Sequence, residues 1–356
     1  MTPNPQQPEP RSAPQPESRS APEGATVTTP RPRRRARSIL IGVAVAAVVF
    51  AVLPYVGITI PGVFDGPLNA PGTLNLLGLC FVFGALALTY DLVFGYVGLL
   101  SFGHALYFAT GVYVTAIALA RWHWSLPTAL ALTAAVSLVL PLVLGAICLR
   151  MRDIPFAMVT LAFAQAGSIL VMQNPFGLTG GEEGLALGGD TLPAALVGVV
   201  NTRNVYWIAL LLLIVVYAIA WRAVNSPAGR VWQAIRENER RARFLGIPTD
   251  RHIWLSWVIS CTFVGLAGTL YALLNNFADP HDLRWDQSGD FVIMAVLGGM
   301  RSFWGPLIGA AIFVVLQDYV SSRTQNWMSF IGLFFVLVVL FFPRGVLGII
   351  RRRAAA

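Results

Sequence analysis

Long apolar stretches alternate with short polar ones along most of this 356-residue chain. Each long stretch holds about 20 residues, which is the length of an α-helix that crosses the hydrocarbon core of a bilayer. The pattern therefore predicts an all-α, polytopic membrane protein with about ten transmembrane segments. The predicted apolar segments cover residues 39–56, 74–94, 103–120, 126–149, 154–172, 205–221, 253–275, 290–300, 304–320 and 327–343.

One segment, residues 290–300, is too short for a full helical crossing. A short helix at membrane depth is tolerated where it is packed against protein or lines a water-filled cavity. We therefore expect a half-helix or re-entrant piece here, of the kind that often lines a transport path.

The arginines predict the orientation of the segments. If the N-terminus lies inside and the short piece counts as a crossing, the C-terminus is also inside. On this arrangement 21 of the 25 basic residues, all arginines, lie on the inner side. Because basic loops stay on the cytoplasmic side of a membrane, we expect both termini in the cytoplasm.

The amino-acid composition argues against several classes of protein. The chain is 56% hydrophobic and 12% charged, with a mean hydropathy of +0.66, unlike a soluble domain. Its net charge of +8 sits in short stretches between apolar segments, which indicates membrane topology and no nucleic-acid partner. The scattered cysteines and histidines predict no metal site and no bound cofactor: Cys80, Cys148, Cys261, His104, His123, His252 and His281.

The first 37 residues differ from the rest. Residues 1–30 are rich in Pro, Ser, Glu and Gln and cannot bury a core, so we expect residues 1–37 to form a disordered, Pro/Ser/Arg-rich cytoplasmic tail. The arginine cluster from Arg31 to Arg37 precedes the first apolar segment without a small-residue cleavage site, which indicates an uncleaved anchor. Residues 38–350 then form one transmembrane domain.

The longest polar insertion on the inner side, residues 222–253, contains a predicted helix. Ser226 and Pro227 are typical of a helix start, and Gly246 followed by Pro248 is typical of a stop, so residues 228–245 should be helical. The helix is amphipathic. Its apolar side carries Trp232, Ile235, Ala242 and Leu245, and its opposite side carries Arg236, Arg240 and Arg243. It could lie on the inner leaflet or contact a cytoplasmic partner.

Several separated segments resemble the LivM-type permeases of the branched-chain amino acid ABC transporter family, and the resemblance covers roughly residues 72–350. The inner polar segment resembles the family's coupling segment at residues 226–230, 234–239 and 245–247. The other matching segments are residues 95–98 with 101–104, 156–163, 178–181 with 184–185, 296–299 with 304–306, and 341–345.

The resemblance implies a permease that is not itself an enzyme and that lies in the bacterial inner (plasma) membrane. It implies a homologous second permease, two ATP-binding subunits and an extracytoplasmic substrate-binding protein as partners, in addition to membrane lipid. The chain has no phosphate-binding loop motif, so ATP would be bound by the partner subunits. The coupling helix, residues 226–246, would contact an ATPase subunit through Trp232, Ile235, Arg236, Glu237, Glu239, Ala242 and Gly246.

This sequence departs from the family's coupling pattern at three positions. It has Arg240 and Arg241 where Glu-Ala or similar residues are usual, and Arg243 where an acidic residue is frequent. We therefore expect a more acidic groove on the partner.

The glycine-rich segments have two interpretations, close helix packing and backbone bending around a substrate path. The pathway interpretation names Gly95, Gly98, Ser101, Gly103, His104, Gly298 and Gly299. Ionisable residues in or near apolar segments are either structural or functional: Asp91, His104, Arg301 and Asp318.

Two outer loops are acidic. They form either a solvated rim or, as the resemblance implies, a docking surface for the binding protein, formed by Glu182, Glu183, Asp279 and Asp282. The substrate implied is a branched-chain or other hydrophobic amino acid.

Three alternatives stay open on the sequence. One is a urea or short-amide permease of the same superfamily, which Asp91 before the glycine segment also resembles. A second is an ion-coupled secondary transporter with Asp91 and His104 as a proton relay, although such a protein has no need of a long capped cytoplasmic helix. A third, a membrane-bound enzyme, would need clustered catalytic groups that are not evident.

Overall fold

The computed structural model describes residues 42, 45–55, 57, 66–187, 201–341 and 345–346. The chain divides into two units, residues 1–46 and 47–356. The expected disordered tail, residues 1–37, lies outside the described residues. The second unit contains all of the helices from Pro71 onward.

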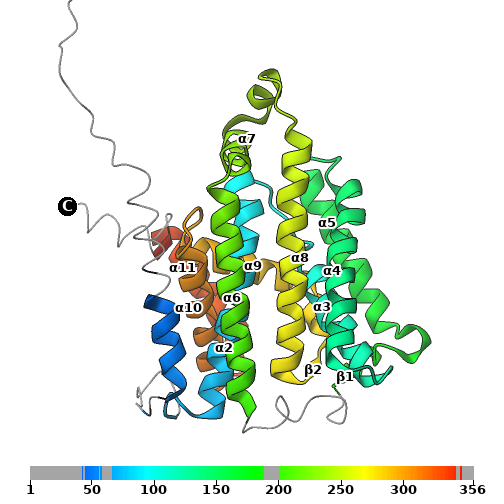
Figure 1. Ribbon diagram of the computed structural model, residues 1–356, viewed down its shortest axis with the longest axis vertical. Coiled ribbons are helices and arrows are strands. Elements are labelled where there is room, and N and C mark those ends of the chain that lie inside the picture. The colour runs from blue at the N-terminus through cyan, green and yellow to red at the C-terminus, as the bar shows by residue number, and fades with distance from the viewer. Residues whose placement is uncertain are drawn as a thin grey trace, which may run out of the picture. The chain divides into compact units, whose positions relative to one another are not determined.

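Helices form nearly all of the described part of the second unit (Figure 1). Helix α2 runs from Pro71 to Asp91 and continues as a π-helical turn, η2, from Leu92 to Val97. The other helices are α3 (His104–Ala120), α4 (Leu126–Cys148), α5 (Asp153–Met172), α6 (Thr202–Val224), α7 (Pro227–Phe244), α8 (Thr249–Asn275), α9 (Trp285–Gly298), α10 (Gly305–Ser321) and α11 (Trp327–Phe341). Shorter elements are η1 (Leu53–Tyr55), η3 (Pro175–Gly177), η4 (Gly181–Glu183), η7 (Pro280–Leu283), β1 (Leu185–Ala186) and β2 (Phe277–Ala278).

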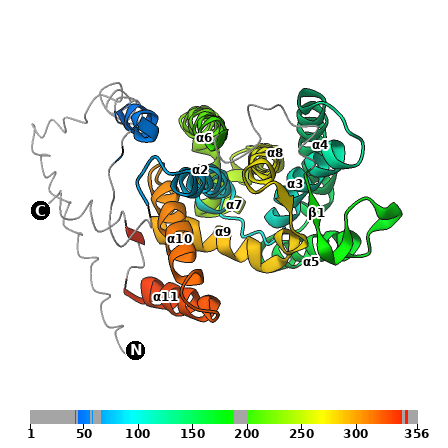
Figure 2. The same ribbon diagram turned by 90° about the horizontal axis from the view of Figure 1, so that it is seen from below.

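Helices α2 and α8 form the core. In the most apolar stretch of α2 with η2, 89% of the residues are buried, and in that of α8, 72% are buried. In the corresponding stretch of α4 only 22% of the residues are buried. Helix α2 packs against α6, α8 and α10, and α8 packs also against α3 and α4 (Figure 2). The exposed apolar faces of α4, α5 and α6 therefore suit contact with lipid.

Five of the described helices are long and apolar enough to cross a membrane: α2 with η2, α4, α5, α6 and α8. Helices α3, α10 and α11 are apolar but shorter. The prediction of an all-α polytopic membrane protein is confirmed. The expected short piece is α9, whose 14 residues span about 21 Å at about 1.5 Å per residue, less than the roughly 30 Å of a hydrocarbon core.

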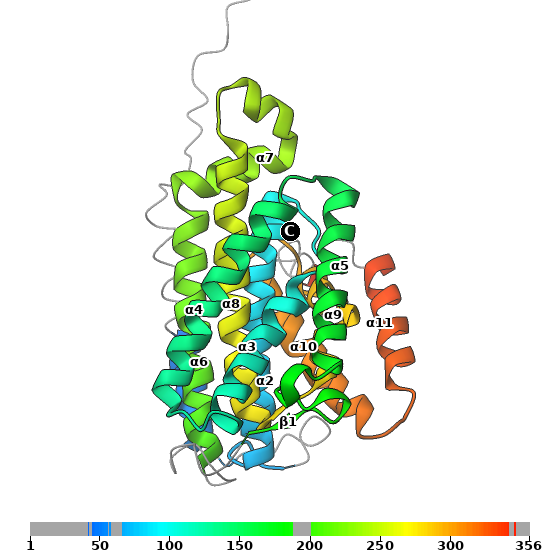
Figure 3. The ribbon, with the colours of Figure 1, turned by 90° about the vertical axis from the view of Figure 1, so that its right-hand side faces the viewer.

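The connections lie at two ends of the helices. At one end, α7 joins α6 to α8 and projects beyond its neighbours (Figure 3). At the other end, β1 pairs antiparallel with β2, with Leu185 opposite Ala278 and Ala186 opposite Phe277 (Figure 1). We refer to these as the α7 end and the β end.

Candidate functional site

The start of α7 has the cap that the sequence predicts. The Ser226 hydroxyl accepts a hydrogen bond from the Gly229 main-chain N–H at 3.4 Å, and Pro227 opens the helix. A Cβ atom on Gly229 would lie 2.0 Å from the Val224 carbonyl oxygen, so the turn between α6 and α7 requires glycine.

The end of α7 also has the predicted stop. Gly246 has a φ of 78°, its N–H donates to the Arg243 carbonyl at 2.9 Å, and the Ile247 N–H donates to the Ala242 carbonyl at 3.2 Å. These two bonds are the Schellman arrangement that ends many helices at glycine.

The helix covers almost the same residues as the predicted helix over 228–245, but it is not continuous. Asn238 has a φ of −163° and a ψ of 98°, which breaks α7. Its side-chain carbonyl accepts the Arg241 N–H at 2.8 Å and so caps the second part. Asparagine is a favoured N-cap residue, and here this local hydrogen bond competes with the helix.

The apolar side of α7 packs on its own chain. Trp232 is 0% exposed, and its indole N–H donates to the His252 carbonyl of α8 at 2.8 Å. Ile235 and Ala242 are buried too. These three side chains therefore pack within the permease and are not exposed to the ATPase subunit that the resemblance implies.

The tip of α7 exposes other residues. Phe244 is 90% exposed and Leu245 is 74% exposed, and Glu237, Arg240 and Arg241 are exposed nearby. Phe244 is not among the contact residues that the resemblance implies, and Leu245 belongs to the predicted apolar side of the helix. Two consecutive large apolar residues precede the predicted glycine stop, but only the packing of α7 shows that they are exposed.

Four charged residues hold α7 to its neighbours. The Glu239 carboxylate pairs with Arg152 at 3.1 Å and with Arg243 at 2.8 Å, and Asp250 pairs with both of these arginines. Arg152 lies between α4 and α5, and Asp250 is in the first turn of α8. We call Arg152, Glu239, Arg243 and Asp250 the charge cluster. Because Glu239 and Arg243 serve this cluster, their side chains hold α7 in place.

Arg236 connects α7 to the end of η2. Its guanidinium donates to the Phe94 carbonyl at 2.6 Å and also to the Gly95 carbonyl. Gly98 lies against it, since a Cβ there would be 3.1 Å from the Arg236 Cγ. Burial lowers the pKa of Arg236, as does the nearby charge of Arg301, whereas Asp91 opposes this shift.

Asp91 connects the same turn to the loop between α9 and α10. It is 0% exposed, and its two carboxylate oxygens accept the Arg301 main-chain N–H at 3.0 and 3.2 Å. Arg301 has a φ of 61°. A Cβ on Gly95 would lie 1.8 Å from an Asp91 carboxylate oxygen, so glycine makes room for this contact.

The glycine-rich segments are packed between helices. A Cβ on Gly298 would lie 1.7 Å from the Gly305 carbonyl oxygen, and one on Gly103 would lie 2.9 Å from the Thr160 side chain. Ser101 and His104 are 0% exposed, and the His104 Nε2 lies 3.2 Å from the Ser260 hydroxyl. A part in the substrate path remains a prediction for these residues.

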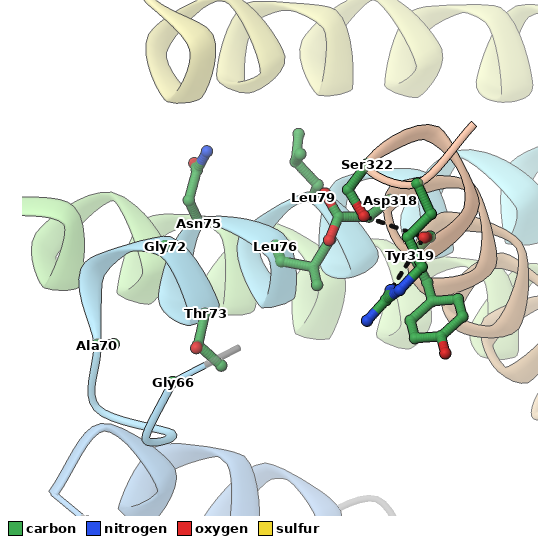
Figure 4. A pocket seen from close by; sticks show the side chains of 11 residues that line it. Gly66, Ala70, Gly72, Thr73, Asn75, Leu76, Leu79, Asp318, Tyr319 and Ser322 are labelled. Atoms are coloured by element: carbon green, nitrogen blue, oxygen red, sulfur yellow. Dashed lines mark hydrogen bonds between the residues drawn. The ribbon is translucent and has the colours of Figure 1, made fainter. Parts of the chain in front are cut away.

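Two cavities that were not expected from the sequence lie toward the β end. The first has a volume of 390 Å³ and lies between the start of α2 and the end of α10 (Figure 4). The second, of 240 Å³, shares Leu76, Leu79 and Asp318 with it and extends to Met294 of α9. The lining side chains with polar atoms are Thr73, Asn75, Tyr271, Asn275, Gln287, Gln317, Asp318, Tyr319, Ser321, Ser322 and Arg323. The polar residues within otherwise apolar helices are the sequence signal that could have indicated these cavities.

The acidic loops meet at the β end through the β1–β2 pair. Glu182 and Glu183 are exposed, and Asp279 is partly exposed and pairs with His281 at 2.7 Å. The expected surface position of Asp282 is wrong. It is 6% exposed, and burial together with the charge of Asp279 raises its pKa to about 7.

Comparison with known proteins agrees with this architecture. Residues 72–341 match the family described as the branched-chain amino acid transport system / permease component. The high-affinity branched-chain amino acid transport permease LivM of Salmonella typhimurium is 29% identical over 79% of this chain and 71% of its own length, and LivM of Escherichia coli is 28% identical over the same shares.

A second type of permease is also similar. LivH of Salmonella typhimurium is 27% identical over 77% of this chain and 94% of its own length. No solved structure is significantly similar to the chain. The match over residues 72–341, together with the all-α membrane architecture, shows that the chain belongs to the branched-chain amino acid transport permease family.

Proposed function

We propose that this chain is the membrane-spanning permease subunit of an importer that takes up branched-chain or other hydrophobic amino acids, driven by ATP hydrolysis on partner subunits. The exposed tip of α7 is the observation that carries the proposal. Phe244 and Leu245 are more than two-thirds exposed, and α7 projects beyond the adjacent helices (Figure 3). An exposed apolar pair flanked by arginines suits a partner with an apolar groove and an acidic rim.

The arginines support an orientation with the α7 end in the cytoplasm. In the ten-crossing arrangement predicted from the sequence, 21 of the 25 basic residues lie on the inner side, together with the α7 segment. The chain would then cross the bacterial inner membrane several times, with both termini cytoplasmic. Two ATP-binding subunits would contact the α7 end, and the chain has no phosphate-binding loop motif of its own.

Similarity to both LivM and LivH supports a homologous second permease as partner. At the β end, Glu182, Glu183 and Asp279 would contact a substrate-binding protein from outside. The cavities that share Asp318 would receive the amino acid there, since they extend from the β end to the short helix α9. The names of these relatives support branched-chain amino acids over urea or short amides.

Reconstitution tests this proposal. The chain, a second permease, two ATPase subunits and a binding protein are placed in liposomes, and uptake of radiolabelled leucine is measured with ATP or with an ion gradient. We expect uptake only with ATP and with all components present. Uptake by the chain alone on an ion gradient would make it a secondary transporter, and ATP-driven uptake of urea without leucine would overturn the substrate class.

A further inference from the structure

Four arginines line a cavity at the α7 end for which the proposed function has no use. The cavity has a volume of 750 Å³ and lies between the last turn of α4 and the first turns of α8. Its basic lining is Arg150, Arg152, Arg243 and Arg251, and its one acidic lining residue is Asp250. Gly145, Ala146, Leu149 and Trp254 form its apolar side. We call this space the arginine cavity.

The arginine cavity has an excess of positive charge. Arg152 and Arg243 are paired with Glu239 and Asp250 in the charge cluster. Arg150 and Arg251 are exposed, and among the described residues neither side chain has an ion pair or hydrogen bond. Two positive charges beside the cavity are therefore unpaired within the described part of the chain.

The apolar side of the cavity continues onto the outer face of α4. Val139, Val143 and Ile147 are each about half exposed and follow one another at helical spacing toward the cavity. Trp254 of α8 is 37% exposed at the cavity's edge, and tryptophan is enriched where membrane helices meet the headgroup layer. Gly145 and Ala146 of α4 also line the cavity. A Cβ atom on Gly145 would lie 2.8 Å from the Trp257 ring, so α4 and α8 approach closely beside it.

We propose that the arginine cavity binds the headgroup of an anionic phospholipid whose acyl chains lie along the outer face of α4. Basic pockets between transmembrane helices are suited to anionic headgroups, since each arginine near the membrane surface attracts them. A water-soluble phosphate would use the arginines but not the apolar face that continues from them. The cavity and that face together favour the lipid.

The test compares lipid binding by the full chain and by matched variants. The chain is held in nanodiscs or detergent, and binding of phosphatidylglycerol and of phosphatidylcholine is measured by native mass spectrometry. Arg150→Gln/Arg251→Gln should weaken phosphatidylglycerol binding roughly 30-fold, from about 1 kcal/mol per arginine, and leave phosphatidylcholine unchanged. Arg150→Lys/Arg251→Lys should retain most of the preference.

The control is Arg222→Gln/Arg230→Gln, which removes two arginines at the same end but outside the cavity. It should bind phosphatidylglycerol as the unchanged chain does. Equal loss in the control and cavity variants, no preference for phosphatidylglycerol over phosphatidylcholine, or displacement of the lipid by millimolar inorganic phosphate would each overturn the proposal. None of these outcomes bears on amino acid transport.

Discussion

Arg236 of α7 donates a hydrogen bond to the main-chain carbonyl of Phe94 at 2.6 Å. One helical turn earlier, Asp91 accepts the main-chain N–H of Arg301. Helix α7 and the α9–α10 loop therefore contact the same short segment of α2 and η2. A displacement of α7 by a partner would reach the loop after the short helix α9 through groups in direct contact.

Stability measurements test whether Gly95 makes room for the contact between Asp91 and the α9–α10 loop. Asp91→Ala leaves the Arg301 N–H without its acceptor, at a cost of about 1–3 kcal/mol, and Gly95→Ala drives a Cβ into the Asp91 carboxylate. Each variant should lower the thermal unfolding temperature of the purified permease. The double variant should lose less stability than the sum of the two, because removing the carboxylate makes room for the methyl group.

Gly289→Ala is the matched control for the glycine substitution. A Cβ at position 289 would meet nothing within 4 Å, so this change should leave the unfolding temperature nearly unchanged. Additive losses in the double variant would show that the two positions act separately.

Gly246→Val tests the end of α7. Its φ of 78° is a left-handed conformation that costs a β-branched residue on the order of 1 kcal/mol or more. Since nothing lies within 4 Å of a Cβ there, the effect would come from the backbone alone. We expect normal abundance in the membrane with reduced ATP-driven uptake. Gly246→Asn, which tolerates this conformation better, should retain more uptake, and equal uptake by both variants would contradict a role for the glycine conformation.

Asp282 predicts a pH dependence of stability. In the folded chain the Asp282 carboxyl group keeps its proton until about pH 7. In the unfolded chain it releases the proton near its ordinary pKa of 3.8. The folded state therefore binds more protons between these values, and stability should fall as pH rises from about 4 to about 7. Thermal unfolding from pH 4 to 8 measures this slope. In Asp282→Asn the slope should be smaller, and an unchanged slope would assign it to other groups.

The sequence predicts the helices of this protein well because apolar length and cap residues are local properties. Ser226 and Gly246 mark the bounds of α7 through hydrogen bonds to residues within a few positions. The burial of Trp232 depends instead on packing against α8, which periodicity along one helix does not contain. The break at Asn238 comes with a local hydrogen bond from the Arg241 N–H, which the helical pattern does not predict.

The same dependence on packing explains why the sequence predicts only part of the candidate site. An amphipathic pattern predicts that Trp232 and Ile235 face something apolar but not whether that surface is their own chain or a partner. The Asp91–Arg301 contact likewise joins residues that are distant in sequence. The burial of Asp282 also depends on packing and not on its own loop sequence. The exposed Phe244 and Leu245 could be identified only once the packed side of α7 was known.

The exposed tip of α7 is proposed to couple this permease to ATPase subunits. ATP hydrolysis by the reconstituted complex, stimulated by the loaded binding protein, tests this coupling when Phe244→Ser/Leu245→Ser is compared with the unchanged chain. These side chains pack little on their own chain, so the variant should fold normally, bind the ATPase subunits more weakly and lose most of the stimulation. We predict that the variant loses most of the stimulated ATP hydrolysis while its abundance in the membrane is unchanged. Full binding of the ATPase subunits with normal stimulation would contradict the proposed coupling.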